Sequence, residues 1–222
     1  MHLRQEKNGC WQATLGDIHM GCTLSLDELA PFAPRILKQV HGVAIHDDAG
    51  YDGSDQQGDG LVSDCERQAL VVKTADCVPL TITDGVRIGA IHAGWRGTAA
   101  GVVKRLSEYF HPRRTHVVIG PAISAANYEV DADLYTDWLQ REPVLARFLT
   151  SSPQGGSKRQ LDLKGFVRHQ LLGLGVPERQ IETIPVCTYA SALPSYRRMS
   201  HLAKRIYSYI YRVAANHEGG LR

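Results

Sequence analysis

A cysteine and a histidine flank two short apolar runs that an Asp-Gly pair separates. Cys77 precedes the run Val78–Thr83, and His92 ends the run Val86–His92, with Asp84-Gly85 between them. An Asp-Gly pair between β-branched runs predicts a tight hairpin, because glycine adopts the positive φ that such a turn needs. With a two-residue turn there, Cys77 lies opposite His92, so the backbone alone brings a thiol and an imidazole together.

The Cys77–His92 pair has two chemical interpretations and one structural interpretation. The imidazole can lower the pKa of the thiol and produce a nucleophile. Alternatively, both side chains bind a metal and a third ligand comes from elsewhere, since catalytic zinc takes three protein ligands and keeps one open position for water. Buried cysteines and strand-end histidines are also ordinary parts of a protein core. The spacing leaves these interpretations open.

The segment after His92 reads Ala-Gly-Trp-Arg-Gly and predicts a strand–turn–helix connection. Gly94 and Gly97 let the backbone approach a ligand, and the N–H groups at the start of the helix can bind an anion. Arg96 can add a bidentate contact to phosphate or carboxylate. The alternative is a tight turn in which Trp95 fills the core.

Eight short motifs in a fixed order make the sequence resemble a known family. They are QVHG (39–42), TADCVPL (74–80), HAGWRGTAAGVV (92–103), GPAI (120–123), YEV (128–130), LDL (161–163), CTY (187–189) and SYRR (195–198). This pattern resembles the YfiH-like family, also called the laccase-domain or multicopper polyphenol oxidoreductase family. The resemblance covers residues 36–210.

The resemblance implies a fold, a metal and an activity. The fold is a four-layer α/β/β/α domain of the α+β class with mixed sheets. The metal is zinc, bound by His41, Cys77 and His92, which are also the implied catalytic residues. The activity is phosphorolysis of adenosine, inosine, guanosine or methylthioadenosine, and deamination of adenosine. The implied partners are therefore a purine nucleoside and phosphate.

Five further residues are candidates for substrate binding. Asp76 and Glu129 are the carboxylates that could act as acid or base in deamination, in which the metal activates water for attack at C6 of adenine. Arg96 and Arg197 could hold the phosphate that attacks C1′ in phosphorolysis. Gln39 belongs to the same motif as His41. Asp76 could instead cap its turn, and Glu129 and Arg197 could be structural ion-pair partners.

The sequence departs from the family pattern in three places. The opening segment is short and lacks the usual glycine turn before Asp27. Ser124–Asn127 stands where relatives often have Gly-Pro-Cys-Cys, and Met199–Arg205 replaces a Thr-Gly-Arg segment. These differences concern the rim that selects the substrate and leave the three metal positions intact.

Three alternative functions follow from the same motifs. One is a copper-dependent, laccase-like polyphenol oxidase, but a two-His, one-Cys copper site usually adds a weak axial methionine, and only Met1, Met20 and Met199 occur in the chain. Another is a peptidoglycan editing factor, which needs a groove for a muropeptide precursor. The third is a non-catalytic binding module with a structural zinc, in which Cys187 is the fourth ligand.

The elements that must position these residues are short strands and helices. Strands are predicted at Ala69–Lys73, Val78–Thr83, Val86–His92, Thr115–Ile119 and Ile181–Val186. Helices are predicted at Thr98–Phe110, after Asp131 up to Pro143, across Leu163–Leu171, and near Ser200–Asn216. The mixture and the hairpin favour an α+β domain over a repeating βαβ array.

Composition limits the class of protein. The chain has 222 residues and 43% hydrophobic residues, which predicts one domain over residues 1–222. Lys and Arg (25) nearly balance Asp and Glu (23), which gives no field that would favour nucleic acid or a membrane surface. No apolar run is long enough for a membrane span, and the opening lacks a signal-peptide core. We expect a cytoplasmic monomer or small homo-oligomer with free or metal-bound thiols.

Overall fold

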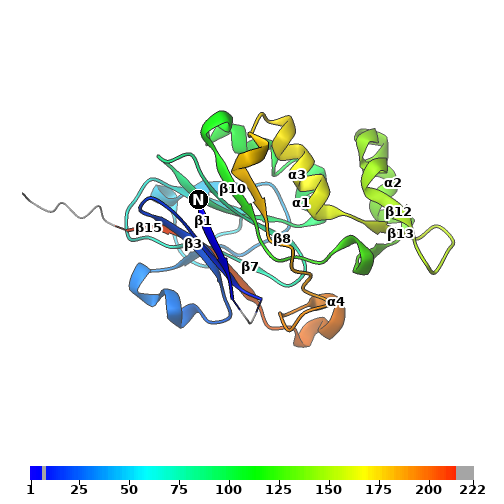
Figure 1. The fold of residues 1–222 in the computed structure, drawn as a ribbon, viewed down its shortest axis with the longest axis horizontal. Coiled ribbons are helices and arrows are strands. Elements are labelled where there is room, and N and C mark those ends of the chain that lie inside the picture. The colour runs from blue at the N-terminus through cyan, green and yellow to red at the C-terminus, as the bar shows by residue number, and fades with distance from the viewer. Residues whose placement is uncertain (7–8, 214–222) are drawn as a thin grey trace, which may run out of the picture.

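Two six-stranded sheets form the centre of the molecule (Figure 1). The computed structural model describes residues 1–6 and 9–213. The first sheet has the order β1-β2-β3-β15-β7-β4. Its strands are β1 (His2–Gln5), β2 (Trp11–Leu15), β3 (Ile18–Thr23), β15 (Ile206–Arg212), β7 (Leu70–Thr74) and β4 (Arg35–Ile36).

The second sheet has the order β14-β10-β8-β9-β6-β5 and carries the predicted hairpin. Its strands are β14 (Ile181–Thr183), β10 (His116–Ile119), β8 (Val78–Thr83), β9 (Ile88–Ala93), β6 (Gly60–Ser63) and β5 (Ile45–Asp47). Both sheets are mixed, since β4 pairs with β7 and β10 with β14 in parallel while β8 and β9 are antiparallel. All five predicted strands are therefore present, with ends shifted by a few residues.

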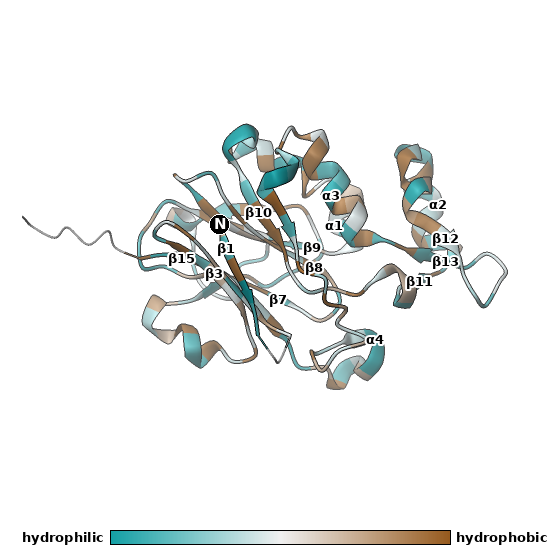
Figure 2. Cartoon of the chain, in the orientation of Figure 1, coloured by the Kyte–Doolittle hydropathy of each residue, from teal (hydrophilic) through white to brown (hydrophobic). Residues whose placement is uncertain are grey.

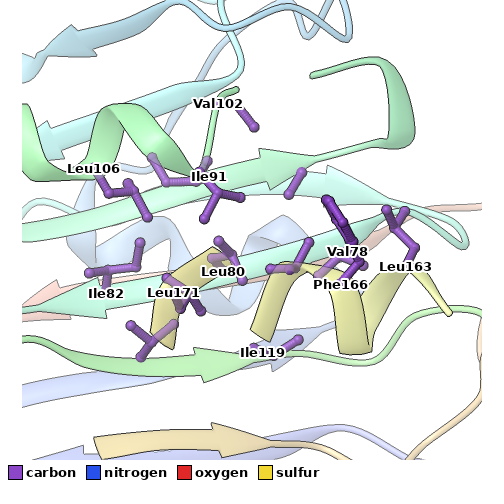
Figure 3. Close-up of a cluster of buried hydrophobic side chains, with 14 of the residues drawn as sticks. Val78, Leu80, Ile82, Ile91, Val102, Leu106, Ile119, Leu163, Phe166 and Leu171 are labelled. Carbon is purple, nitrogen blue, oxygen red and sulfur yellow. The ribbon is translucent and has the colours of Figure 1, made fainter. Parts of the chain in front are cut away.

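Helices cover one face of the second sheet. They are α1 (Trp95–Ala100) and α3 (Leu163–Gly173). α2 (Ala132–Arg141) lies beyond α3 and packs against it through Trp138 and Phe166, and the short α4 (Tyr196–Met199) lies apart (Figure 1). Val78, Leu80 and Ile91 of the hairpin pack against Phe166 and Leu171 of α3 in one buried cluster (Figure 3). A small sheet, β11-β13-β12, projects beside α2 and was not predicted; its strands are β11 (Glu129–Val130), β13 (Arg159–Leu161) and β12 (Leu149–Ser151).

A second buried cluster fills the space between the two sheets. Trp11, Met20 and Ile210 of the first sheet meet Leu61 and Val118 of the second. The outer face of the first sheet is covered by a 3₁₀ segment, Leu26–Phe32. The hydropathy colouring shows apolar residues gathered on the strands, whereas α4 is hydrophilic (Figure 2). The layers confirm the expected α+β class with mixed sheets, with a 3₁₀ segment as the fourth layer.

The helix predicted near Ser200–Asn216 is wrong over its described part. Residues 206–212 form strand β15, and residues 214–216 lie outside the described residues. Leu202 and Ile206 have helical spacing, but Leu202 is 71% exposed and therefore anchors no helix face. The run Ile-Tyr-Ser-Tyr-Ile-Tyr is rich in residues that favour strands, and β15 pairs on one side with β3 and on the other with β7.

The helix predicted at Thr98–Phe110 is also only partly correct. The α-helical part ends at Ala100, because Gly101 adopts φ +98° and turns the chain. Residues Lys104–Glu108 continue as a 3₁₀ helix. Val102, Val103 and Leu106 are nevertheless buried, as the spacing predicted.

Within the described residues, no helix is long and apolar enough to cross a membrane.

A candidate metal site in a cationic pocket

The hairpin exists, but its register differs from the prediction. Thr83 pairs with Ile88, so the turn holds four residues, and Pro79 rather than Cys77 lies opposite His92. The longer turn is stabilised by Asp84, whose carboxylate accepts hydrogen bonds from the N–H groups of Val86 and Arg87. Because the register differs by two residues, the side chains stay on the predicted face. Cys77 thus remains a diagonal neighbour of His92.

The three predicted metal ligands come together at the end of the hairpin. One ligand atom each of His41, Cys77 and His92 lies within 4.8 Å of the other two. The Cys77 sulfur is 4.0 Å from Nε2 of His41, and the two imidazole rings are 4.7 Å apart at their centroids. His92 is buried, Cys77 is partly buried and His41 is exposed. Such a set can hold a metal on one side and keep its other side open to a ligand.

Asp59 holds both histidines in place and was missed by sequence analysis. Its carboxylate lies 2.7 Å from Nδ1 of His92, which leaves Nε2 of that ring for a metal. The same carboxylate accepts hydrogen bonds from the backbone N–H groups of Val40, His41 and Gly42 at 3.3, 3.0 and 2.6 Å. These bonds hold His41 at φ +60°, a conformation that costs free energy for a residue with a side chain.

The charged forms of Asp59, His92 and Cys77 stabilise one another. Burial opposes ionisation of Asp59, but hydrogen bonds from His92 and the Gly42 and Val40 N–H groups lower its pKa. Burial would lower the pKa of His92, but the bonds to Asp59 and Cys77 raise it to about 9. Burial would likewise keep Cys77 neutral, yet His41 and His92 lower the pKa of its thiol to about 6. Cys77 is therefore a thiolate at neutral pH, the form that binds metals.

Two glycines let the neighbouring segments approach the histidines. A Cβ on Gly94 would lie 2.9 Å from Cδ2 of His41 and 3.2 Å from Cε1 of His92. A Cβ on Gly97 would lie 2.5 Å from the carbonyl oxygen of Gly42. Gly97 therefore serves the packing of α1 against the His41 loop.

The triad opens into a pocket of about 540 Å³. This volume is in the range of small-molecule sites. Gln39, Asp76, Arg96 and Arg197 of the five predicted substrate-binding residues line it. Sequence analysis gave no substrate-binding role to the other polar and aromatic lining residues, which include Lys38, Lys73, Thr74, Trp95, Tyr128, Tyr196 and Arg205.

Asp76 lies beside the triad, but its carboxylate is already engaged. It accepts hydrogen bonds from Thr188 Oγ1 at 2.5 Å, Ser195 Oγ at 3.1 Å and the Arg197 N–H at 2.6 Å. Its backbone adopts φ +91°. These contacts support the interpretation of Asp76 as the residue that holds its turn and joins it to the start of α4.

Glu129 does not line this pocket. Its carboxylate forms an ion pair with Lys158 at 3.0 Å and accepts a hydrogen bond from Ser152, while its carbonyl oxygen accepts one from Arg197. Gln39 binds the backbone of Lys73 through both ends of its amide, at 2.7 and 2.8 Å. Gln39 therefore positions Lys73 through its side chain, whereas Glu129 contacts the pocket residue Arg197 only through its backbone carbonyl.

The arginines of the pocket lie over aromatic rings. The guanidinium of Arg96 is 4.4 Å from the ring centroid of Trp95, and that of Arg197 is 5.4 Å from the ring of Tyr128. Neither guanidinium has a carboxylate partner within 4.0 Å among the described residues. Burial raises the pKa of the Tyr128 hydroxyl, which therefore stays protonated and can donate a hydrogen bond.

Fold and site together define a class: an α+β protein in which two histidines and a cysteine form a candidate metal site within a cationic pocket. Residues 25–212 match the family model described as multi-copper polyphenol oxidoreductase laccase. The chain belongs to this laccase-domain family, also known by the name YfiH.

Named relatives and a solved structure agree with this assignment. A purine nucleoside phosphorylase of Synechocystis sp. is 31% identical over 194 residues, which cover 73% of this chain and 74% of the relative. One from Bacteroides thetaiotaomicron is 37% identical over 139 residues, 59% of this chain and about half (51%) of the relative. A crystal structure from Neisseria meningitidis superposes with a TM-score of 0.83 at 25% identity and covers 94% of this chain and 100% of that one.

Proposed function

We propose that this protein is a zinc-dependent purine nucleoside phosphorylase, which cleaves a purine nucleoside with inorganic phosphate. The observation that carries the proposal is the presence in one pocket of a His–Cys–His triad and of two arginines, Arg96 and Arg197, that have no ion-pair partner among the described residues. The names of the relatives support the same reaction class.

The donor set fits zinc. Zinc binds imidazole nitrogen and thiolate sulfur, and a catalytic site keeps a position open beside three protein ligands. Among the described residues, Cys187 is not part of the cluster: its sulfur lies 3.2 Å from the Ser124 hydroxyl. The lining residues within the described part of the chain include no methionine to serve as the axial ligand of a copper site. A zinc ion held by these residues would supply a Lewis acid toward the substrate.

The residues of the chain bind and orient both reactants. Arg96 and Arg197 hold phosphate through charge-assisted hydrogen bonds, and the ring of Tyr196 offers a face for the purine. A phosphate oxygen forms a bond to C1′ as the bond from C1′ to the purine nitrogen breaks. The electron pair passes to the base, and the protonated hydroxyl of Tyr128 can donate a hydrogen bond to it.

Adenosine deamination is the second reaction that the family resemblance implies. Zinc base deaminases use a carboxylate as acid and base. Asp76 is the only carboxylate among the described lining residues, and three donors already bind it. The geometry therefore favours phosphorolysis over deamination.

Product analysis tests the proposal. Zinc-loaded protein is incubated with adenosine or inosine, with and without phosphate, and free base, ribose 1-phosphate and inosine are resolved. We expect free base and ribose 1-phosphate only when phosphate is present. Cys77→Ala should abolish this turnover, while Cys65→Ala, a change at an exposed cysteine outside the pocket, should not.

Four outcomes contradict the proposal or part of it. No turnover by the wild type, or equal turnover by Cys77→Ala, rejects a metal-dependent nucleoside enzyme. Formation of inosine from adenosine without phosphate would show that the reaction is deamination and not phosphorolysis. Turnover with copper and not with zinc would keep the pocket as the active site but reject zinc as its metal.

A further inference from the structure

Three cations line the pocket in addition to the two arginines that our proposal uses. They are Lys38, Lys73 and Arg205, and all three belong to the first sheet or to the residues that adjoin its strands. Arg96 and Arg197, by contrast, lie in α1 and α4. The pocket thus has two cationic groups with different structural origins.

The three cations come from neighbouring segments of the first sheet, at or beside β4, β7 and β15. Ile36 of β4 pairs in parallel with Val71 of β7, but Lys38 then bridges to Gln57, and the side chain of Gln39 binds the Lys73 backbone instead. Tyr207 of β15 pairs with Lys73, and Arg205 is two positions before Tyr207, hence on the same face. All three residues line the same pocket and together form a cationic cluster in its wall.

The backbone around the cluster is held firmly. The Gln39 amide binds both the N–H and the carbonyl oxygen of Lys73. The guanidinium of Arg205 donates to the carbonyl oxygens of Ala203 at 2.5 Å and of its neighbour Lys204 at 3.1 Å. The segment that carries Lys38 is therefore bound to Lys73 through Gln39, and the Arg205 guanidinium is held against its own segment.

No carboxylate compensates this cluster. None of Lys38, Lys73 and Arg205 has an ion-pair partner within 4.0 Å among the described residues, whereas Arg35, Arg87 and Arg105 each have one. Like charges at neighbouring positions of a sheet repel one another. A bound anion would remove this repulsion.

We propose that Lys38, Lys73 and Arg205 form a subsite for a phosphate group that the substrate itself carries, so that the preferred substrate is a nucleoside 5′-monophosphate. This inference rests on the proposed phosphorylase function and specifies its substrate. The inorganic phosphate that attacks C1′ binds at Arg96 and Arg197, and the substrate phosphate binds at the sheet. Two separate cationic groups then match two separate anions.

The test compares a nucleoside with its 5′-monophosphate on zinc-loaded protein. Binding of adenosine and of AMP is measured by calorimetry, and kcat/KM is measured for both with saturating inorganic phosphate. We expect kcat/KM for AMP to exceed that for adenosine by about tenfold or more, a difference typical of one charge-assisted contact. In the double variant Lys73→Gln/Arg205→Gln, kcat/KM for AMP should fall to about the value for adenosine, so that the preference is lost.

Lys204→Gln is the matched control. Lys204 is exposed, directly precedes Arg205 in the sequence and does not line the pocket. This variant should retain the wild-type preference for AMP. Loss of the preference in Lys204→Gln would mean that general surface charge, and not the subsite, attracts the nucleotide.

The outcomes separate this inference from the function on which it rests. Turnover of adenosine with no preference for AMP in binding or kcat/KM overturns the subsite and leaves the phosphorylase function standing. A higher KM for inorganic phosphate in the double variant, with AMP unaffected, assigns the cluster to the attacking phosphate and also overturns the inference. Turnover of neither compound, together with equal binding of both, rejects both proposals.

Discussion

One buried carboxylate organises the candidate metal site. Asp59 is fully buried, contacts the ring of His92 and binds three successive N–H groups of the His41 loop. It thereby links two ligands that lie far apart in the sequence. A carboxylate that binds the second nitrogen of a ligand histidine fixes the ring orientation and strengthens it as a ligand.

The Asp59→Asn variant should bind zinc about 10–100-fold more weakly, because the amide lacks the charge that supports His92. Competition with a chromophoric chelator measures this affinity, and circular dichroism checks that the variant is folded. Asp64→Asn, a change at an exposed carboxylate five residues along, should bind zinc like the wild type. Wild-type affinity in Asp59→Asn would refute the supporting role.

Sequence analysis identified the two histidines and the cysteine that cluster in the structure, but it missed the carboxylate that holds the histidines. The hairpin brought Cys77 to His92 without any knowledge of the family, and an error of two residues in register left them on one face. His41 came only from the family resemblance. Asp59 stands in a stretch that reads as a polar loop, and nothing local shows that its carboxylate is buried against His92.

At the scale of elements, the strained turn between β7 and β8 is bound by hydrogen bonds to the start of α4. Asp76 adopts φ +91°, and its carboxylate binds Thr188, Ser195 and the N–H of Arg197. Asp76→Ala should lower the free energy of unfolding by about 2–4 kcal/mol, since three buried donors lose their acceptor and alanine disfavours positive φ.

Asp76→Asn should cost less, because asparagine tolerates this conformation and keeps one oxygen acceptor. Urea denaturation of both variants provides the measurement. Equal losses for alanine and asparagine would show that the hydrogen bonds to this side chain contribute little.

The contacts of Glu142, at the end of α2, should make the stability of the protein depend on pH. Burial alone would raise the pKa of Glu142, but Lys104, the Trp138 indole and Gln170 outweigh burial and lower it. Lys104 Nζ lies 2.7 Å from its carboxylate. A carboxyl group whose pKa is lowered on folding stabilises the protein above its unfolded pKa of about 4.5 and loses this effect as pH falls through the folded value.

We therefore expect Glu142→Gln to be less stable than the wild type at pH 7, by about 1 kcal/mol, and the difference to shrink below about pH 4. Thermal unfolding followed across this pH range tests the expectation. A difference that stays constant with pH would mean that the charge of Glu142 has no part in it.

Elements were predictable where hydrophobic spacing was unambiguous. All five predicted strands and the helix over Leu163–Gly173 are present. The last strand was read as a helix because Leu202 and Ile206 are four residues apart, whereas tertiary pairing on both sides decides in favour of a strand. The three-stranded sheet beside α2 consists of strands of two or three residues, too short for any periodic pattern.

At the scale of the whole molecule, β15 connects two parts of the first sheet. It pairs with β3 over six residues and with β7 over five, and it is the only strand between them among the described residues. A chain that ends at Arg205 should fail to fold cooperatively, because β3 and β7 would each expose an unpaired edge. Loss of a sharp thermal transition, or aggregation on expression, tests this. A soluble chain with a normal transition would contradict it.

The position of β15 also sets the order in which the protein can mature during synthesis. The ribosome releases β1–β4 and β7 long before residues 206–212, so the first sheet must wait for its inner strand. Such late, long-range closure makes folding slow and favours chaperone binding meanwhile. Lys73 and Arg205 reach their places only when β15 inserts. The insertion of β15 therefore completes the pocket and at the same time covers the strand edges through which the nascent chain could aggregate.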